Sequence, residues 1–221
     1  MSALDTTIPA PTSIERRRMS YEEYKHWEHQ GGLTEWVDGE VHIYMPPTIL
    51  HQRMVAFLAF LLQGFVRLHR LGEVLSAPIT MRAIEGANAR EPDLFFLATE
   101  HLGYLTETEL NGPADLAVEI ISLDSVLRDR DDKFYEYQAG GIREYWIIDP
   151  RPKRKRADFF VLDQNGMYQP VPVADGIYRS AVLPNFWLKI DWLWAEDPNA
   201  LAYLAEVVGV EQLLKAIQSD A

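Results

Sequence analysis

Apolar residues recur along the chain at two different spacings, and each spacing predicts a different kind of element. Between residues 50 and 71 they return every three or four positions, the period of a helix with one buried face. Leu58, Leu62 and Phe65 mark that face. Applied to the whole chain, this pattern and its end signals predict helices over residues 21–30, 50–71, 124–140 and 197–220.

Alternating or continuous apolar runs of shorter length predict strands. Asp38-Gly39 stands between two alternating segments and is a strong short signal for a hairpin. Strands are predicted within residues 33–45, 73–83, 92–98, 114–122, 142–149, 157–163, 167–173, 176–183 and 186–194. This order predicts an α/β or α+β fold, in which helices flank a mixed β-sheet between an N-terminal hairpin and a β-rich C-terminal part.

Composition divides the chain into three parts and excludes several classes of protein. Residues 1–18 are predicted to be a flexible tail, residues 19–194 one domain, and residues 195–221 a C-terminal helical extension. The chain has no cysteine, which excludes disulfides, thiol nucleophiles and zinc–thiolate sites. We find no signal-peptide pattern and no apolar run that predicts a membrane span, so a cytoplasmic protein without a membrane partner is expected.

The net charge of -12 counts against loose, charge-driven binding to nucleic acid, but it leaves room for an enzyme with a local basic surface. Basic residues are in fact clustered at 16–18 and 151–156. The simplest interpretation of the second cluster is a solvated turn between strands.

A carboxylate interrupts the most apolar of the predicted strands. Glu119 lies between Val118 and Ile120, where an unpaired charge costs several kcal/mol or becomes protonated. Asp93 opens another predicted strand, directly after Pro92. Acidic residues on neighbouring strands can share a divalent cation, which removes the cost of burying them, and Mg²⁺ favours such oxygen ligands.

Lys133 lies in the helix that follows the Glu119 strand. Beside a metal it would orient the attacking water and stabilise negative charge in the transition state, as in a phosphodiester hydrolase. Simpler alternatives remain open for all three residues. Asp93 could bond its own backbone, Glu119 could pair with Arg143, and Lys133 could lie on an exposed helix face near Asp129.

Several stretches together resemble the signature of a known family. They are "EPDLFFL", "ADLAVEIIS" and "RDRDDKFYEYQAGGIREYWIIDP", preceded by "MSYEEY", "EWVDGEVHIYMPPTILHQR" and "LGEVLSAPITMRA". Over residues 19–194 the chain is similar to the Uma-two family of bacterial restriction-endonuclease-like proteins, within the PD-(D/E)XK nuclease superfamily. The resemblance implies a restriction-endonuclease-like core, a mixed sheet flanked by helices.

The resemblance also assigns roles to particular residues. It makes Pro92-Asp93 the PD element and Glu119 the second acidic ligand. The superfamily lysine stands two positions after that acid, where this chain has Ile121. The family pattern instead places the lysine on the next helix, which matches Lys133.

Four further positions match the family pattern. His51 would be a third metal ligand or a base near the water, although it could equally be a solvent-facing residue at a helix start. Glu35 is a weaker candidate on the hairpin. The main-chain carbonyl of Ile120 would complete the metal shell, and Ser122 would tie the strand end to the helix start.

The leading hypothesis is a Mg²⁺-dependent endonuclease, with Mn²⁺ as an alternative ion, that hydrolyses phosphodiester bonds in nucleic acid, with DNA favoured over RNA. The alternatives are a nuclease-fold binding or regulatory module with weak or absent catalysis, and a hydrolase of smaller phosphoesters. Cutting both strands of a duplex is simplest for a two-fold dimer, so a homodimer is expected, with the apolar C-terminal tail or the 20–45 region at the contact.

Overall fold

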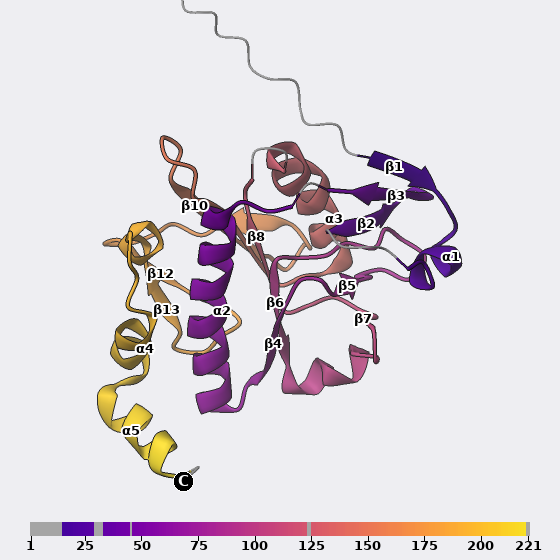
Figure 1. Ribbon diagram of the computed structural model, residues 1–221. Helices are drawn as coiled ribbons and strands as arrows, with labels where there is room; N and C mark the ends of the chain where they lie inside the picture. Colours follow the sequence, from indigo (N-terminus) through magenta and orange to yellow (C-terminus); the bar gives the residue numbers. More distant parts are fainter. Residues whose placement is uncertain (1–14, 29–32, 45, 123–124, 220–221) are drawn as a thin grey trace, which may run out of the picture.

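The centre of the computed structural model is a six-stranded mixed sheet, and the described residues are 15–28, 33–44, 46–122 and 125–219 (Figure 1). The strand order is β11-β10-β9-β8-β6-β4. Strands β8 (Leu116–Ile120) and β9 (Glu144–Asp149) run parallel in the middle, and the other neighbouring pairs are antiparallel. The outer strands are β4 (Gly72–Ser76), β6 (Leu94–Ala98), β10 (Arg156–Leu162) and β11 (Tyr168–Pro170). The predicted mixed sheet flanked by helices is confirmed.

Helices cover both faces of this sheet. On one face, α2 (Ile49–His69) and α4 (Ala200–Val208) pack over a core that includes Val118 and Ile120 of β8. On the other, α3 (Lys133–Gly140) packs over Ala117. Because strand side chains alternate between faces, Glu119 points to the α3 side. Figure 1 shows the sheet between α2 and α3.

A second, smaller sheet lies beside the main one, with the order β1-β3-β2. The predicted hairpin is confirmed as β2 (Thr34–Val37) and β3 (Glu40–Ile43), and Asp38 and Gly39 form its turn at positive φ. Residues 15–18 form β1 (Glu15–Arg18), paired with β3, so the prediction of a flexible tail is wrong for these four residues. Residues 1–14 of that predicted tail lie outside the described residues.

Three predicted elements are interrupted in the structure. The strand predicted over 73–83 is divided into β4 and β5 (Thr80–Met81), on either side of the cis peptide before Pro78, and β5 pairs with β7 (Glu109–Leu110). The segment 186–194 contains only β13 (Trp187–Lys189), paired with β12 (Ile177–Arg179), before a 3₁₀ turn. The C-terminal helix is divided at Gly209 into α4 and α5 (Val210–Ser219).

The two N-terminal helices differ from their predicted lengths. The first, α1 (Tyr21–Lys25), is shorter than expected, and its capping box at Ser20 and Glu23 is confirmed. Helix α2 is long and apolar enough to span a membrane by length and composition. Its apolar face is instead occupied by the core, where Leu58, Leu61 and Phe65 are buried.

The helix predicted over 124–140 contains a wider turn at its start. Residues Arg128–Asp132 form a π-helical turn, in which the Lys133 N–H donates to the carbonyl of Arg128. Helix α3 then continues to Gly140 and ends at Gly141, which adopts φ 81° as a left-handed cap. Such π turns often occur at functional sites.

Candidate active site

Asp93 and Glu119 meet at one edge of the main sheet. Strands β6 and β8 are antiparallel with Leu94 opposite Val118, so one further step along this register places Asp93 opposite Glu119, on the same face. Asp93 Oδ2 accepts a hydrogen bond from the Ile120 N–H at 2.7 Å. The Asp93 side chain therefore bonds the backbone of the neighbouring strand rather than its own backbone.

His51 reaches the same carboxylate from the first turn of α2. Its Nε2 lies 3.1 Å from Asp93 Oδ2, and its side chain is 9% exposed. The helix begins at this point because the Thr48 side chain accepts from the His51 N–H. The solvent-facing alternative for His51 is wrong, since the ring is buried against Asp93.

Lys133 is fully buried, so the alternative that it lies on an exposed helix face is also wrong. Its Nζ lies 2.8 Å from Glu119 Oε1, 2.9 Å from Glu35 Oε1 and 3.8 Å from Asp129 Oδ1. The ammonium thus has carboxylates from three different elements around it. The pairing considered between Glu119 and Arg143 is absent, because Arg143 pairs with Asp115.

Glu35 is a hub of this cluster and has no exposed surface. Besides Lys133, its carboxylate accepts from Tyr44 Oη at 2.9 Å and from Arg90 Nη1 at 3.0 Å. Burial alone would raise the pKa of Glu35, but Lys133, Arg90 and Arg128 lower it below its usual range. Glu35 is therefore an ionised, fully engaged carboxylate that holds cations in place.

The pKa of Glu119 is shifted in the direction opposite to that of Glu35. Burial, together with Asp129 and Asp93, raises its pKa to about 8, although Lys133 acts against this shift. Burial also raises the pKa of Asp129. Burial disfavours the charge on Lys133, yet Glu119, Glu35 and Asp129 raise its pKa, so the lysine stays protonated. The cluster has more carboxylates than this one ammonium can neutralise.

A cavity of about 420 Å³ opens at this edge of the sheet. Its polar lining comprises Tyr44, Thr48, His51, Gln52, Asp93, Glu119, Ser122, Ser125, Arg128 and Asp129. Ile120 also lines it, whereas Lys133 and Glu35 do not. The Ser122 N–H donates to Ser125 Oγ at 2.9 Å, so Ser122 is part of the link between strand end and helix start, with Ser125 as the acceptor.

The donor set in this cavity fits a hard divalent cation. Tyr137 Oη and Lys133 Nζ both donate to Oε1 of Glu119. Asp129 Oδ1 is buried without a hydrogen-bond partner among the described residues. Mg²⁺ is usually held by one or two carboxylates, with waters and substrate phosphate completing the shell. Within the described ranges no three His, Asp or Glu side chains form a ready-made metal cluster, so water and substrate would have to supply ligands.

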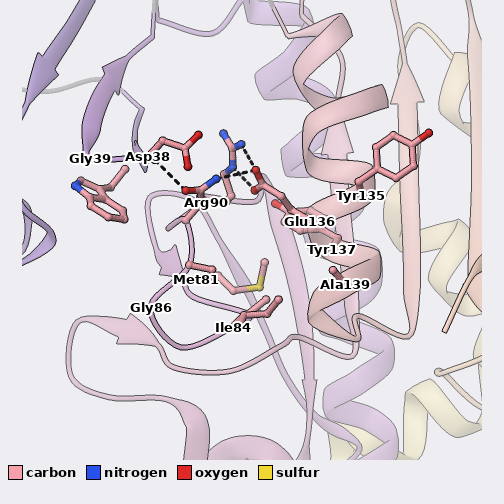
Figure 2. A pocket seen from close by; sticks show the side chains of 14 residues that line it. Asp38, Gly39, Met81, Ile84, Gly86, Arg90, Tyr135, Glu136, Tyr137 and Ala139 are labelled. Carbon is pink, nitrogen blue, oxygen red and sulfur yellow. Dashed lines mark hydrogen bonds and ion pairs between the residues drawn. The ribbon is translucent and has the colours of Figure 1, made fainter.

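A second cavity, of about 580 Å³, is lined by Trp36, Arg90 and Glu136 among others, and its charged groups are arranged differently. Figure 2 shows Arg90 and Glu136 facing one another in it. The Arg90 guanidinium donates to both Glu136 oxygens, at 2.7 and 2.6 Å, and Asn88 donates to the same carboxylate. These charged groups are already paired with each other, whereas atoms of Arg128 and Asp129 in the lining of the smaller cavity lack hydrogen-bond partners among the described residues.

Sequence reasoning identified part of this cluster. The contacts described above join Glu119 and Glu35 through Lys133, and Asp93 to His51, and Asp93 and Glu119 line the same cavity. Arg128, Tyr44 and Arg90 were missed. The run "RDRDD" offered a signal. In a helix, five consecutive charged residues point in all directions, so a helix that packs on the sheet must bury at least one of them. Asp129 is buried, while Asp131 and Asp132 are exposed.

The mixed sheet with helices on both faces is the fold of a restriction-endonuclease-like protein. The family model Uma2, described as "Putative restriction endonuclease", matches residues 21–191. The chain belongs to this family. No curated protein matches it.

A solved structure has the same fold. It is described as a "putative nuclease belonging to DUF820 from Anabaena variabilis ATCC 29413" and superposes with a TM-score of 0.63. The sequence identity is 15%, and the match covers 80% of this chain and 97% of that one. At this identity the likeness shows the fold alone. The family description agrees with a nuclease-like function.

Proposed function

We propose that this protein is a divalent-metal-dependent endonuclease that hydrolyses phosphodiester bonds of nucleic acid, with DNA as the favoured substrate. The observation that carries the proposal is the pair Asp93 and Glu119, opposite one another in a cavity with too few cations to neutralise them. Their carboxylates and the main-chain carbonyl of Ile120 would hold Mg²⁺ or Mn²⁺. A bound ion would neutralise charge on the phosphate and activate water.

The chain's own residues then position the reaction. His51 and the Ile120 N–H orient Asp93, while Lys133 and Tyr137 hold Glu119 through Oε1. In the hydrolysis, the oxygen of a water forms a bond to phosphorus and the bond from phosphorus to the leaving oxygen breaks. One proton of the water ends on the leaving alcohol, and the other stays on the new phosphomonoester or passes to solvent.

The direct test is a cleavage assay with plasmid and single-stranded oligonucleotides in Mg²⁺ or Mn²⁺, comparing wild type with Asp93→Asn. We expect cleavage by the wild type and none above background by the variant. Equal activity of both proteins would locate the cleavage elsewhere or in a contaminant. Activity on a small phosphodiester alone would favour the small-phosphoester alternative, which the modest cavity of about 420 Å³ supports.

A second candidate function is a nuclease-fold binding module with little catalysis. It is favoured by the burial of Lys133, whose ammonium is surrounded by carboxylates and does not line the cavity. This module would bind an oligonucleotide without cleaving it in either metal. The same assay, combined with an electrophoretic binding measurement, separates the two candidates.

We also propose a homodimer in which the C-terminal helices contribute to the contact. Helix α4 is seated on α2, where Gly64 leaves room for Leu204. By contrast, Val210, Leu214 and Ile217 of α5 are exposed, each by more than half. Light scattering at micromolar concentration tests the dimer, and removal of residues 210–221 tests the role of α5. A monomeric mass for the full chain would contradict the proposal.

A further inference from the structure

Lys133 and Arg128 both lie near the carboxylates of the candidate active site, and their surroundings differ. Lys133 is fully buried behind Glu119, and its Nζ is bonded to Glu119 and Glu35. It is not part of the cavity lining. An ammonium group has three donors, so these contacts leave Lys133 little capacity to bind a substrate. A substrate in the cavity would meet Glu119 before it met this lysine.

Arg128 lines the cavity directly. Its side chain is 11% exposed, and its guanidinium carbon lies 3.9 Å from the centre of the Tyr44 ring, in a cation–π contact. Nε and Nη1 are buried and have no hydrogen-bond partner in the part of the chain that the structure describes. The nearest carboxylate oxygens, Asp129 Oδ1 at 3.5 Å and Glu35 Oε2 at 4.0 Å, balance its charge without satisfying those donors.

Buried donors without partners cost free energy and are rare in native proteins, so each requires an explanation. A guanidinium group presents donors in a rigid planar fork that matches two phosphate oxygens. The Tyr44 ring lies against the guanidinium before any ligand arrives. Arg128 therefore presents an incompletely bonded guanidinium in the lining of the same cavity that Asp93 and Glu119 line.

We propose that Arg128 binds the phosphate of the substrate by donating to a non-bridging oxygen, and that Lys133 is a positioning residue that holds Glu119. This inference rests on the proposed function, and it assigns to Arg128 the contact with the transition-state charge that sequence reasoning gave to Lys133. A donor of this kind is expected to contribute about 10²- to 10³-fold to the rate.

Arg130 provides a matched control. It belongs to the same π-helical turn, two residues further on, and pairs with Asp158 at 2.7 Å. It does not line the cavity. We expect Arg128→Ala to lower cleavage by about a hundredfold or more and Arg130→Ala to change it by less than about threefold. Arg128→Lys keeps the charge but lacks the fork, so it should restore only a small part of the rate.

A phosphorothioate measurement distinguishes direct contact from a structural role. Replacing one non-bridging oxygen of the scissile phosphate by sulfur should slow the wild type and Arg130→Ala. Arg128→Lys should cleave the oxygen and the sulfur substrates at similar rates when the sulfur of the diastereomer faces this residue. Thermal unfolding of each variant identifies loss of folding. An unchanged sulfur effect with both diastereomers in folded Arg128→Lys would overturn the proposal.

Failure of the proposed function gives a different result. If the wild type cleaves no substrate in Mg²⁺ or Mn²⁺, nuclease activity is rejected, and binding becomes the test for Arg128. Fluorescence anisotropy with a labelled oligonucleotide should then show that wild type and Arg130→Ala bind the oligonucleotide. Folded Arg128→Lys should bind it at least tenfold more weakly. Equal affinities of the three proteins would overturn the role of Arg128 as well.

Discussion

Buried carboxylates stand at both ends of the two parallel strands β8 and β9, but the two ends neutralise them differently. At the amino-terminal end, Asp115 accepts from the Ala98 N–H and contacts His101 and Arg143. Glu144 on the next strand accepts from five donors: Trp146 Nε1, Tyr178 Oη, Ser180 Oγ and the N–H groups of Ala181 and Val182. These carboxylates are fully bonded within the protein.

At the carboxyl-terminal end, Asp149 of β9 is paired with Arg151, but the carboxylates beside the smaller cavity have fewer donors. Glu119 receives both of its donors on one oxygen, and Asp129 Oδ1 has no hydrogen-bond partner among the described residues. Burial and mutual repulsion raise the pKa of Glu119. The carboxylates at the amino-terminal end thus stabilise the fold through donors of the protein itself, whereas Glu119 and Asp129, beside the smaller cavity, accept from fewer donors among the described residues.

The largest effect should come from the fully bonded end. We expect Glu144→Ala to lower the free energy of unfolding by about 3–5 kcal/mol, because it leaves several buried donors without an acceptor. Denaturant unfolding followed by tryptophan fluorescence measures this change. Cleavage per folded molecule should remain at the wild-type level. A loss of less than about 1 kcal/mol would remove the contrast between the two ends.

Asp93→Asn should have the reverse profile. We expect its cleavage rate to fall by about 10²- to 10³-fold, the range seen when a charge-stabilising group is removed, while its stability without metal stays the same or rises. Kinetics and denaturant unfolding of the same preparation provide both readouts. Asp115→Asn is the matched control, and it should lose stability without losing activity per folded molecule. A strong destabilisation by Asp93→Asn would show that both ends serve the fold.

Divalent ions should stabilise the protein through Asp93 and Glu119 and not through Asp115 and Glu144. At a Mg²⁺ or Mn²⁺ concentration about a hundred times the dissociation constant, the free energy of unfolding should rise by about 2.7 kcal/mol. Asp93→Asn and Glu119→Gln should each weaken ion binding in a calorimetric titration and reduce this gain. The Glu144 end needs no ion, so Glu144→Gln should leave the ion affinity unchanged. Wild-type affinity in both Asp93→Asn and Glu119→Gln would reject the metal site.

The smallest effect is that of a change of one pH unit in the absence of metal. The pKa of Glu119 is raised to about 8 in the folded protein, so the folded state binds a proton that the unfolded state releases near pH 4.5. Stability from this group is complete below about pH 4.5 and is lost as pH rises through about 8, with a slope of at most about 1.4 kcal/mol per pH unit. In Glu119→Gln this loss should disappear. An equal slope in both proteins would assign the pH dependence to another group, such as Glu91, whose pKa burial and Glu35 raise to about 7.

The sequence predicted local elements well where periodicity alone determines them. The alternation around Asp38-Gly39 and the apolar run before Glu119 became a hairpin and a central strand. Periodicity could not show the break at the cis peptide before Pro78, because that residue pair fits an extended pattern on either side. The 3₁₀ turn after Lys189 was missed for a similar reason, since its tryptophans also suit a strand.

The candidate site was only partly predictable because its contacts join distant parts of the chain. Glu119 and Lys133 are close in sequence, and spacing was enough to associate them. Arg90 meets Glu35 across 55 positions, and Tyr44 lies beneath Arg128 through a packing arrangement that no local pattern encodes. Whether a charged residue faces water or a core depends on the phase of its helix. One additional residue in the turn before Lys133 changes that phase.

That additional residue has a consequence for how sequences of this family are aligned. In the π-helical turn the Lys133 N–H bonds five residues back, to Arg128, rather than four. A relative with an ordinary α-helical turn would need one residue fewer between its acid and its lysine to place both at the same point. An alignment of fixed spacing would then pair that lysine with the wrong column and count a working site as missing. A gap of one residue in this turn would therefore reflect a difference in helical winding, with the lysine still beside the acid.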